Sequence, residues 1–281
     1  MKSALPVPAV LIAAAVLSAQ PAPAIPETQA DDLGELTADR PGFGVTTNVL
    51  PRGVTHLESG FTFTSEAGPG ISHRTLTWGS PLARVGIGRR TEIRFGGDGF
   101  LTDRTVAGGY AHRAQGWSDF GWGAKIALYG GHDLWPAVSV IPTLSLPIGA
   151  RTFTSAAVDP NLTLAWSTNL PAKFNAGGTI GFASLSDEAG RFAQRTQALS
   201  VGRALFSGLS GYAEAYNVSP AARAADATWI FNGGLTHALG RNAQIDLEGG
   251  RQLLSASRSW FVSGGLVVRT AGLGHVLSRL K

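Results

Sequence analysis

Residues 119–128 read Asp-Phe-Gly-Trp-Gly-Ala-Lys-Ile-Ala-Leu, and this stretch decides the fold. Large apolar side chains stand at alternate positions, while charged or very small residues occupy the positions between them. Successive side chains of a β-strand point to opposite faces, so the stretch predicts a strand with one face in an apolar medium and the other in a polar or crowded one. The apolar face consists of Phe120, Trp122, Ala124, Ile126 and Leu128.

The same alternation recurs along the chain and predicts twelve strands. The second loses its parity near Pro81, which indicates a β-bulge. On the eighth, Arg195 and Gln197 fall on the predicted outer face. The predicted strands are 54–64, 71–85, 91–102, 117–129, 135–148, 159–169, 173–184, 192–205, 208–218, 226–239, 242–252 and 257–269.

The connections between these strands alternate between short and long. Short connections such as 86–90 and 240–241 alternate along the chain with longer ones such as 103–116 and 184–191. An even number of strands in such a meander is typical of outer-membrane barrels, which never build a long apolar run. The fold class we predict is all-β, a single antiparallel transmembrane β-barrel of about twelve strands.

The composition supports a barrel in a membrane over a soluble one. Hydrophobic residues make up 44% of the chain and charged residues only 15%, against roughly 25% in an ordinary soluble domain. A soluble β-sandwich also alternates, but its outward face would carry many charges. Here the polar face is rich in Gly, Ser, Thr and Asn, and most of the seven Trp fall near strand ends, as interfacial girdles do. A soluble exported β protein stays as the weaker alternative.

The N-terminus has the pattern of a secretory signal peptide. Lys2 precedes an apolar stretch at 4–19, and Ala22-Pro23-Ala24 is a small-x-small cleavage signature. We predict a signal peptide at 1–24, a leader or periplasmic segment at 25–53, the barrel at 54–270 and a C-terminal tail at 271–281. There is no cysteine, which excludes disulfides and thiolate metal sites.

Charge and histidine placement argue against several functions. The 23 basic and 19 acidic residues give a net charge of only +4 and are interleaved, so we expect no nucleic-acid partner. The six His lack metal-ligand spacing, and we expect no metal, no cofactor and no catalytic residue. An enzyme on a membrane barrel remains an alternative, with His73 or His237 near an exposed Ser as its best candidates.

Charged residues on the polar face are the candidate site. They would line the lumen and set charge selectivity, or pair with one another in a filled interior. The segment Asp39-Arg40-Pro41 just before the first strand could fold back as a plug, make a periplasmic contact, or form the turn that starts the barrel; we favour the turn. The predicted lumen-lining residues are Glu58, Glu92, Arg94, Asp119, Lys125, Asp246 and Glu248.

An ordered set of short motifs carries a family resemblance. It comprises residues 37–43, 49–53, 57–61, Arg84 with Gly86, 92–94, Asp119 with Lys125, 144–149, 159–160, 245–251 and 260–261. In this order the chain resembles the outer-membrane barrel family described as "putative MetA-pathway of phenol degradation", over about 39–269. One departure is the end of the last predicted strand near Arg269, since many such barrels end on an aromatic residue.

The resemblance implies a protein of the bacterial outer membrane. Its expected function is a passive channel or transporter for small molecules, aromatic or hydrophobic ones included, without covalent chemistry. The expected partners are outer-membrane lipid, a small-molecule solute and the barrel insertion machinery. The alternatives are an outer-membrane barrel enzyme acting on lipid and a structural barrel with a blocked lumen.

Overall fold

The computed structural model describes residues 34–270 apart from 221, 224 and 254–257. The predicted signal peptide at 1–24 and the tail at 271–281 lie outside the described residues. Among the described residues, no helix is long and apolar enough to cross a membrane.

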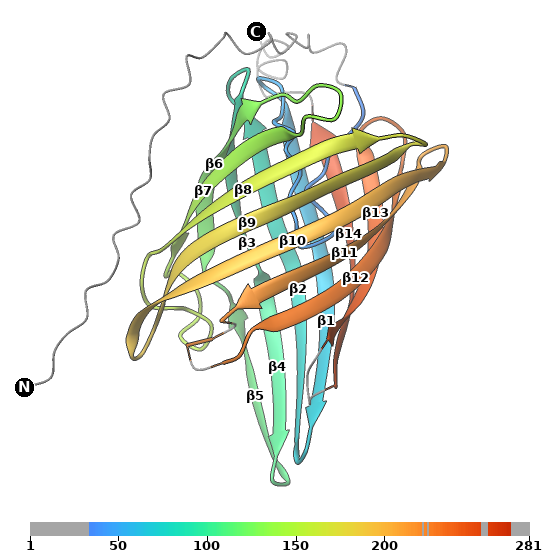
Figure 1. Ribbon diagram of the computed structural model, residues 1–281. Coiled ribbons are helices and arrows are strands. Elements are labelled where there is room, and N and C mark those ends of the chain that lie inside the picture. Colours follow the sequence, from blue (N-terminus) through green and yellow to red (C-terminus); the bar gives the residue numbers. More distant parts are fainter. Residues whose placement is uncertain (1–33, 221, 224, 254–257, 271–281) are drawn as a thin grey trace, which may run out of the picture.

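The described chain is a succession of antiparallel strands, shown in Figure 1. Their bounds are β1 Thr55–Gly68, β2 Ile71–Gly86, β3 Thr91–Gly97, β4 Gly99–Ala107, β5 Tyr110–Trp117, β6 Phe120–Tyr129, β7 Ala137–Leu146, β8 Asp159–Leu170, β9 Phe174–Asp187, β10 Gly190–Phe206, β11 Leu209–Ser219, β12 Thr228–Ala238, β13 Ala243–Leu253 and β14 Arg258–Thr270.

These strands close into a twelve-strand antiparallel barrel, which confirms the predicted fold class. β3 and β4 together occupy one wall position beside β2, and β5 and β6 occupy the next. The barrel closes where β1 pairs with β14, from Thr55 opposite Thr270 to Ala67 opposite Arg258. The predicted bulge is confirmed as well, because the register of β1 against β2 shifts opposite Ser80 and Pro81.

Two predicted long loops are strands in the structure. Residues 103–116 continue β4 and β5 to a tight turn at Gly108 and Gly109, whose φ angles of 56° and 83° suit glycine. Residues 184–191 likewise extend β9 and β10. Beyond the apolar layer both faces of a strand are wet, so the alternation that reveals a strand in sequence fades there. The β1–β2 and β4–β5 hairpins project farther than their neighbours at that end, hereafter the hairpin end (Figure 1).

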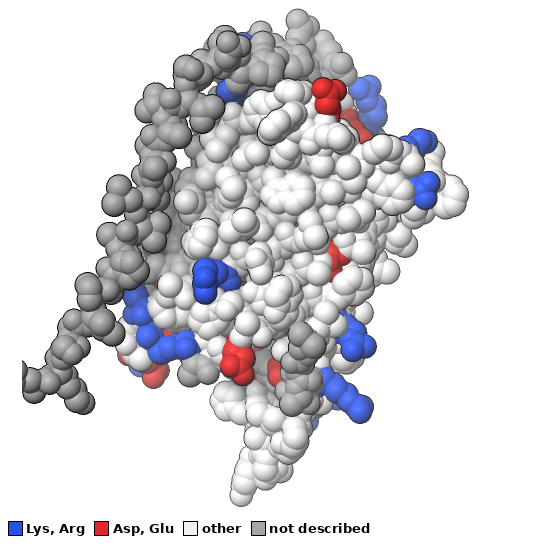
Figure 2. Space-filling view, viewed as in Figure 1, with Lys and Arg blue, Asp and Glu red and all other residues white. Residues whose placement is uncertain are grey.

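The distribution of side chains is inverted relative to a soluble protein. Large apolar side chains are exposed on the outside, among them Trp122, Phe182 and Leu247, whereas the largest fully buried side chains include Arg84 and Lys125. In Figure 2 the visible wall is mainly uncharged, and most charged residues lie towards its two ends. An apolar solvent around the wall explains this pattern.

On the weaker strand β10 the predicted outer face is also confirmed. Arg195 and Gln197 are exposed together with Leu199 and Val201, which follow them at alternate positions.

Candidate functional site

The barrel contains its own N-terminal residues. Residues 34–53, here called the inner segment, precede β1, and at many positions they hydrogen-bond to side chains from strands on different sides of the wall. We favoured a turn into the first strand for Asp39-Arg40-Pro41, and this prediction was wrong. These residues do not form the turn into β1, because β1 starts only at Thr55. They lie inside the barrel. The inner segment enters from the end that carries the short turns, such as Pro171–Lys173, hereafter the short-turn end.

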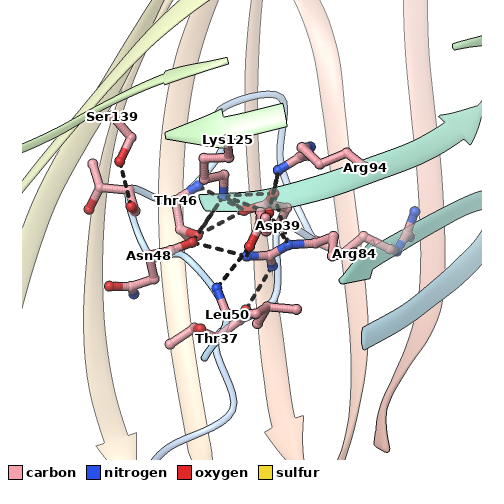
Figure 3. A network of polar contacts seen from close by, with 12 residues as sticks. Thr37, Asp39, Thr46, Asn48, Leu50, Arg84, Arg94, Lys125 and Ser139 are labelled. Carbon is pink, nitrogen blue, oxygen red and sulfur yellow. Dashed lines mark hydrogen bonds and ion pairs between the residues drawn. The ribbon is translucent and has the colours of Figure 1, made fainter. Parts of the chain in front are cut away.

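Asp39 is at the centre of a buried charge cluster (Figure 3). Its carboxylate accepts two hydrogen bonds from Lys125 Nζ, at 2.8 and 2.9 Å, and one from Arg94 Nη1. The Arg84 guanidinium lies 3.6 Å away. These three cations surround the Asp39 carboxylate, which serves as their shared counter-ion.

Arg84 links the wall to the inner segment through several bonds. Its guanidinium donates to Glu92 at 2.8 and 3.0 Å and to Glu58 at 3.2 Å. It also donates to the backbone carbonyls of Thr37 and Asn48, at 2.9 and 3.0 Å. A planar guanidinium offers five donors, which is what allows one side chain to hold two carboxylates and two carbonyls.

The two carboxylates also grip the backbone of the inner segment directly. Glu58 accepts from the backbone N–H of Asp39 at 3.1 Å and of Arg40 at 3.0 Å. Glu92 accepts from the N–H of Leu50 at 2.9 Å. Unpaired buried N–H groups are costly, so these contacts satisfy a segment that has no sheet ladder of its own.

Arg40 points the other way and binds the last two strands. Its Nη2 donates to Asp246 on β13 at 3.1 Å and to Ser263 on β14 at 3.2 Å. The facing wall residues Gly60 and Gly265 leave the space for it, because a Cβ on either would lie 2.6 or 2.3 Å from the Arg40 side chain. Asp39 thus binds residues of strands early in the sequence, whereas the adjacent Arg40 binds residues of the last two strands.

The turn after Arg40 packs against β11. Glu214 accepts hydrogen bonds from the backbone N–H groups of Phe43 at 2.7 Å and Gly44 at 2.8 Å. The Phe43 ring stacks on Tyr216 with their centroids 4.3 Å apart and an interplanar angle of 4°. An aromatic stack adds to the hydrogen bonds and fixes the direction of the turn.

The chain returning towards β1 is bound by hydroxyl groups of β7 and β8. Ser139 Oγ donates to the carbonyl of Thr47 at 2.6 Å, and the hydroxyl groups of Thr47 and Ser167 lie 2.6 Å apart. The inner segment therefore contacts wall residues on β1, β2, β3, β6, β7, β8, β11, β13 and β14.

Cavities lie on both sides of the inner segment. One of about 630 Å³ extends towards the hairpin end and is lined by Thr143, Asn161 and Phe153. Another of about 360 Å³ extends towards the short-turn end, past Asn169 and Gln244. Both are lined by Asp39, Arg40 and Val45. Residues 39–45 therefore separate the two spaces.

The chain matches a known protein family. The family described as "Putative MetA-pathway of phenol degradation" matches residues 38–270. The chain belongs to this family. The matched region starts inside the inner segment and covers Asp39 as well as the wall.

Solved structures share the fold at low sequence identity. An outer membrane channel from Pseudomonas putida F1 superposes with a TM-score of 0.61 at 13% identity, over 82% of this chain and 99% of that one. The transport unit of the autotransporter AIDA-I from Escherichia coli gives a TM-score of 0.50 at 10% identity, over 82% and 94%. At these identities the likeness concerns the barrel architecture. No curated protein matches the chain.

The sequence-predicted lumen residues fall into two groups. Glu58, Glu92, Arg94, Lys125 and Asp246 are buried and bind the inner segment.

The other two, Asp119 and Glu248, bind a loop and the wall, and Asp119 also lines the cavity on the hairpin side. Asp119 accepts from the backbone N–H groups of Gly149 and Ser155, both at 2.9 Å, and so holds the connection between β7 and β8. Glu248 accepts from the Tyr212 hydroxyl at 2.5 Å and lies 3.3 Å from Asn232 Nδ2.

Sequence reasoning missed several residues that hold the inner segment. Arg84 was hidden by the bulge at Pro81, which shifts the parity of β2 just before it. Glu214 lies on a strand with weak alternation, but its position between Tyr212 and Tyr216 on one face was a usable signal. Asp39 and Arg40 gave no strand signal at all.

His73, one of the two histidines considered for a hydrolytic site, does not have the geometry of a catalytic triad in the structure. His73 contacts both Asp103 and Thr75 through the same ring nitrogen, Nε2. A catalytic triad needs the acid on one ring nitrogen and the nucleophile on the other. No group of three or more His, Asp or Glu that could hold a metal occurs among the described residues.

Proposed function

We propose that this protein is a passive channel of the bacterial outer membrane for small molecules, with the inner segment as the barrier in its lumen. The observation that carries the proposal is the pair of cavities, about 630 and 360 Å³, that share Asp39, Arg40 and Val45. A solute in the first cavity would reach the second if the inner segment, residues 39–47 included, moved aside. No rearrangement of the strand ladder is needed.

The charge arrangement supports a segment that is held yet releasable. Its contacts are polar and charge-assisted rather than part of the sheet ladder, so they can be exchanged for water without breaking the wall. The fold, the family membership and the apolar outer wall support the outer-membrane location.

The solute class follows from the cavity on the hairpin side. Its lining combines the side chains of Phe153 and Leu185 with polar and charged groups such as Thr143, Arg94 and Asp119. Ligand pockets combine apolar surface with polar groups that fix the orientation of the ligand. Small molecules with an apolar ring or chain and a polar substituent fit this lining.

A reversible tether tests whether the inner segment is the barrier. Thr47 and Ser167 are hydroxyl partners at 2.6 Å, and the chain has no cysteine, so T47C/S167C introduces a single unambiguous disulfide. We expect the oxidised protein in a planar bilayer to conduct near the bare-membrane baseline. Reduction should restore the wild-type conductance.

The single variants T47C and S167C are the matched controls, and their conductance should not change when the oxidant is added. If the tethered protein conducts as well as the reduced one, solute passes without movement of this segment and the proposed barrier is wrong. If the wild type does not conduct and the tether leaves its conductance unchanged, the protein is better explained as a structural barrel with a blocked lumen.

Barrel formation in a membrane has its own test. A closed ladder of hydrogen bonds resists denaturing detergent until heated, because no strand edge is open to attack. We expect the protein extracted from outer membranes to migrate faster on a denaturing gel before boiling than after. An unshifted band from the soluble periplasmic fraction would contradict both the barrel and its location.

A further inference from the structure

Three arginines lie abreast on the outer face of the hairpin end. Arg74 on β2 is directly opposite Arg104 on β4, and Arg104 is directly opposite Arg113 on β5. All three side chains are exposed. In the part of the chain that the structure describes, none of the three makes an ion pair with an acidic side chain. We call these residues the arginine row.

This arrangement is unfavourable for the protein alone. Directly opposed residues of an antiparallel pair have Cβ atoms about 4.5–5.5 Å apart, and like charges there repel. The acidic residues of the same hairpins, Glu66 and Asp103, belong to the alternate set of positions on the other face, where Asp103 holds His73. An external anion is the missing counter-ion.

The position of the row along the strands indicates where that anion comes from. Four residues nearer the barrel centre, a row of aromatic rings crosses the same strands through Trp78, Phe100 and Trp117. The Phe100 and Trp117 ring centroids are 5.7 Å apart, and Trp78 and Trp117 are each 52% exposed. Aromatic girdles mark the membrane interface.

The arginine row lies on the membrane-facing side just beyond that girdle. Four residues of strand span about 13 Å, or less along the membrane normal once the strand tilt is included. The headgroup region adds about 5–8 Å on each side of the hydrocarbon core, within reach of long arginine side chains at this position. Guanidinium groups bind phosphate through paired hydrogen bonds, which suits them to a phosphorylated headgroup.

Short turns of outer-membrane barrels face the periplasm, so the hairpin end faces outward. We propose that the arginine row binds the phosphate groups of a phosphorylated glycolipid in the outer leaflet of the membrane. Trp78 and Trp117 pack against its acyl chains, and the three arginines share its phosphates. The site depends on the membrane location of the barrel but not on transport, so it can succeed or fail independently of the channel.

The test is a binding titration of the full-length protein, purified in a neutral detergent, with diphosphorylated lipid A as the probe. The variant R74Q/R104Q/R113Q removes the row while leaving the girdle. Each arginine near an anionic surface contributes about a factor of five, so we expect binding roughly 100-fold weaker.

The matched control removes three cations from the opposite end of the barrel. Arg52, Lys173 and Arg241 are exposed at the short-turn end, so R52Q/K173Q/R241Q carries the same net charge as the test variant. We expect this control to bind the probe as the wild type does. Equal binding by the test variant and the control would overturn the proposal, as would equal affinity of the wild type for dephosphorylated lipid A. Gel mobility before heating shows that each variant is folded.

A second arm separates a lipid from a free anion. Inorganic phosphate shares the charge but lacks the acyl chains that would reach Trp78 and Trp117. We expect it to compete only at concentrations far above those of the lipid. If inorganic phosphate binds the wild type as tightly as lipid A does, the row is a general anion site and the lipid proposal is wrong.

Discussion

Replacing Asp39 with Asn should open the channel. The amide keeps the size of the carboxylate but removes its charge, so Lys125, Arg94 and Arg84 lose their shared counter-ion. Breaking a buried ion pair by removing one partner costs about 3–5 kcal/mol. Because the strand ladder is unaffected, this cost weakens chiefly the attachment of the inner segment. We expect a several-fold rise in mean conductance in a planar bilayer, with the barrel still closed on an unheated gel.

The same substitution at Asp187 is the control. Asp187 forms an exposed pair with Arg223 at the hairpin end, with Oδ2 2.8 Å from Nε. Exposed pairs contribute about 0–1 kcal/mol, so D187N should leave the conductance unchanged. An Asp39→Asn protein that conducts no better than D187N would show that the cluster does not hold the barrier.

Replacing Arg84 with Met should destabilise the barrel itself. The side chain is fully buried, and its loss leaves Glu58 and Glu92 as neighbouring carboxylates without their shared cation. Both belong to wall strands, so the cost of about 3–5 kcal/mol falls on the wall as well as on the inner segment. We expect a much lower temperature at which the fast-migrating gel band disappears, or a failure to fold.

A compensating variant keeps this prediction falsifiable even if R84M does not fold. In E58Q/R84M/E92Q the two uncompensated charges are removed together with the arginine, which recovers part of the lost stability. Arg84→Lys keeps the charge without the planar fork and should be intermediate. A triple variant no more stable than R84M would mean that packing, not charge pairing, is what Arg84 contributes.

The wall could be predicted from sequence because its physics is local and periodic. An apolar medium on one side selects alternate residues, and Trp122 and Leu128 follow this rule within a few positions of each other. The rule failed at 103–116, where the strands leave that medium. It also failed at Arg84, where one extra residue in the bulge reverses the faces.

The inner segment could not be predicted in the same way. Asp39 binds partners 86 and 55 residues away, and Arg40 binds one 206 residues away. Nothing in the local sequence names these partners. The charges on the wall were visible, but whether they face water or one another depends on what fills the lumen, which only the three-dimensional structure reveals.

Asp39 and Arg40 bind strands from the two ends of the barrel sequence, and this bears on how the barrel closes during folding. The seam between β1 and β14 joins the two ends of the barrel sequence, so closing it carries the largest loop entropy and the most non-local pairing. Asp39 binds Lys125 and Arg94 on the early strands, while the adjacent Arg40 binds Asp246 and Ser263 on the last two. Two neighbouring residues therefore act as a clasp across the seam. We therefore expect the same twenty residues that form the proposed barrier to help bring the first and last strands of the barrel into register during folding.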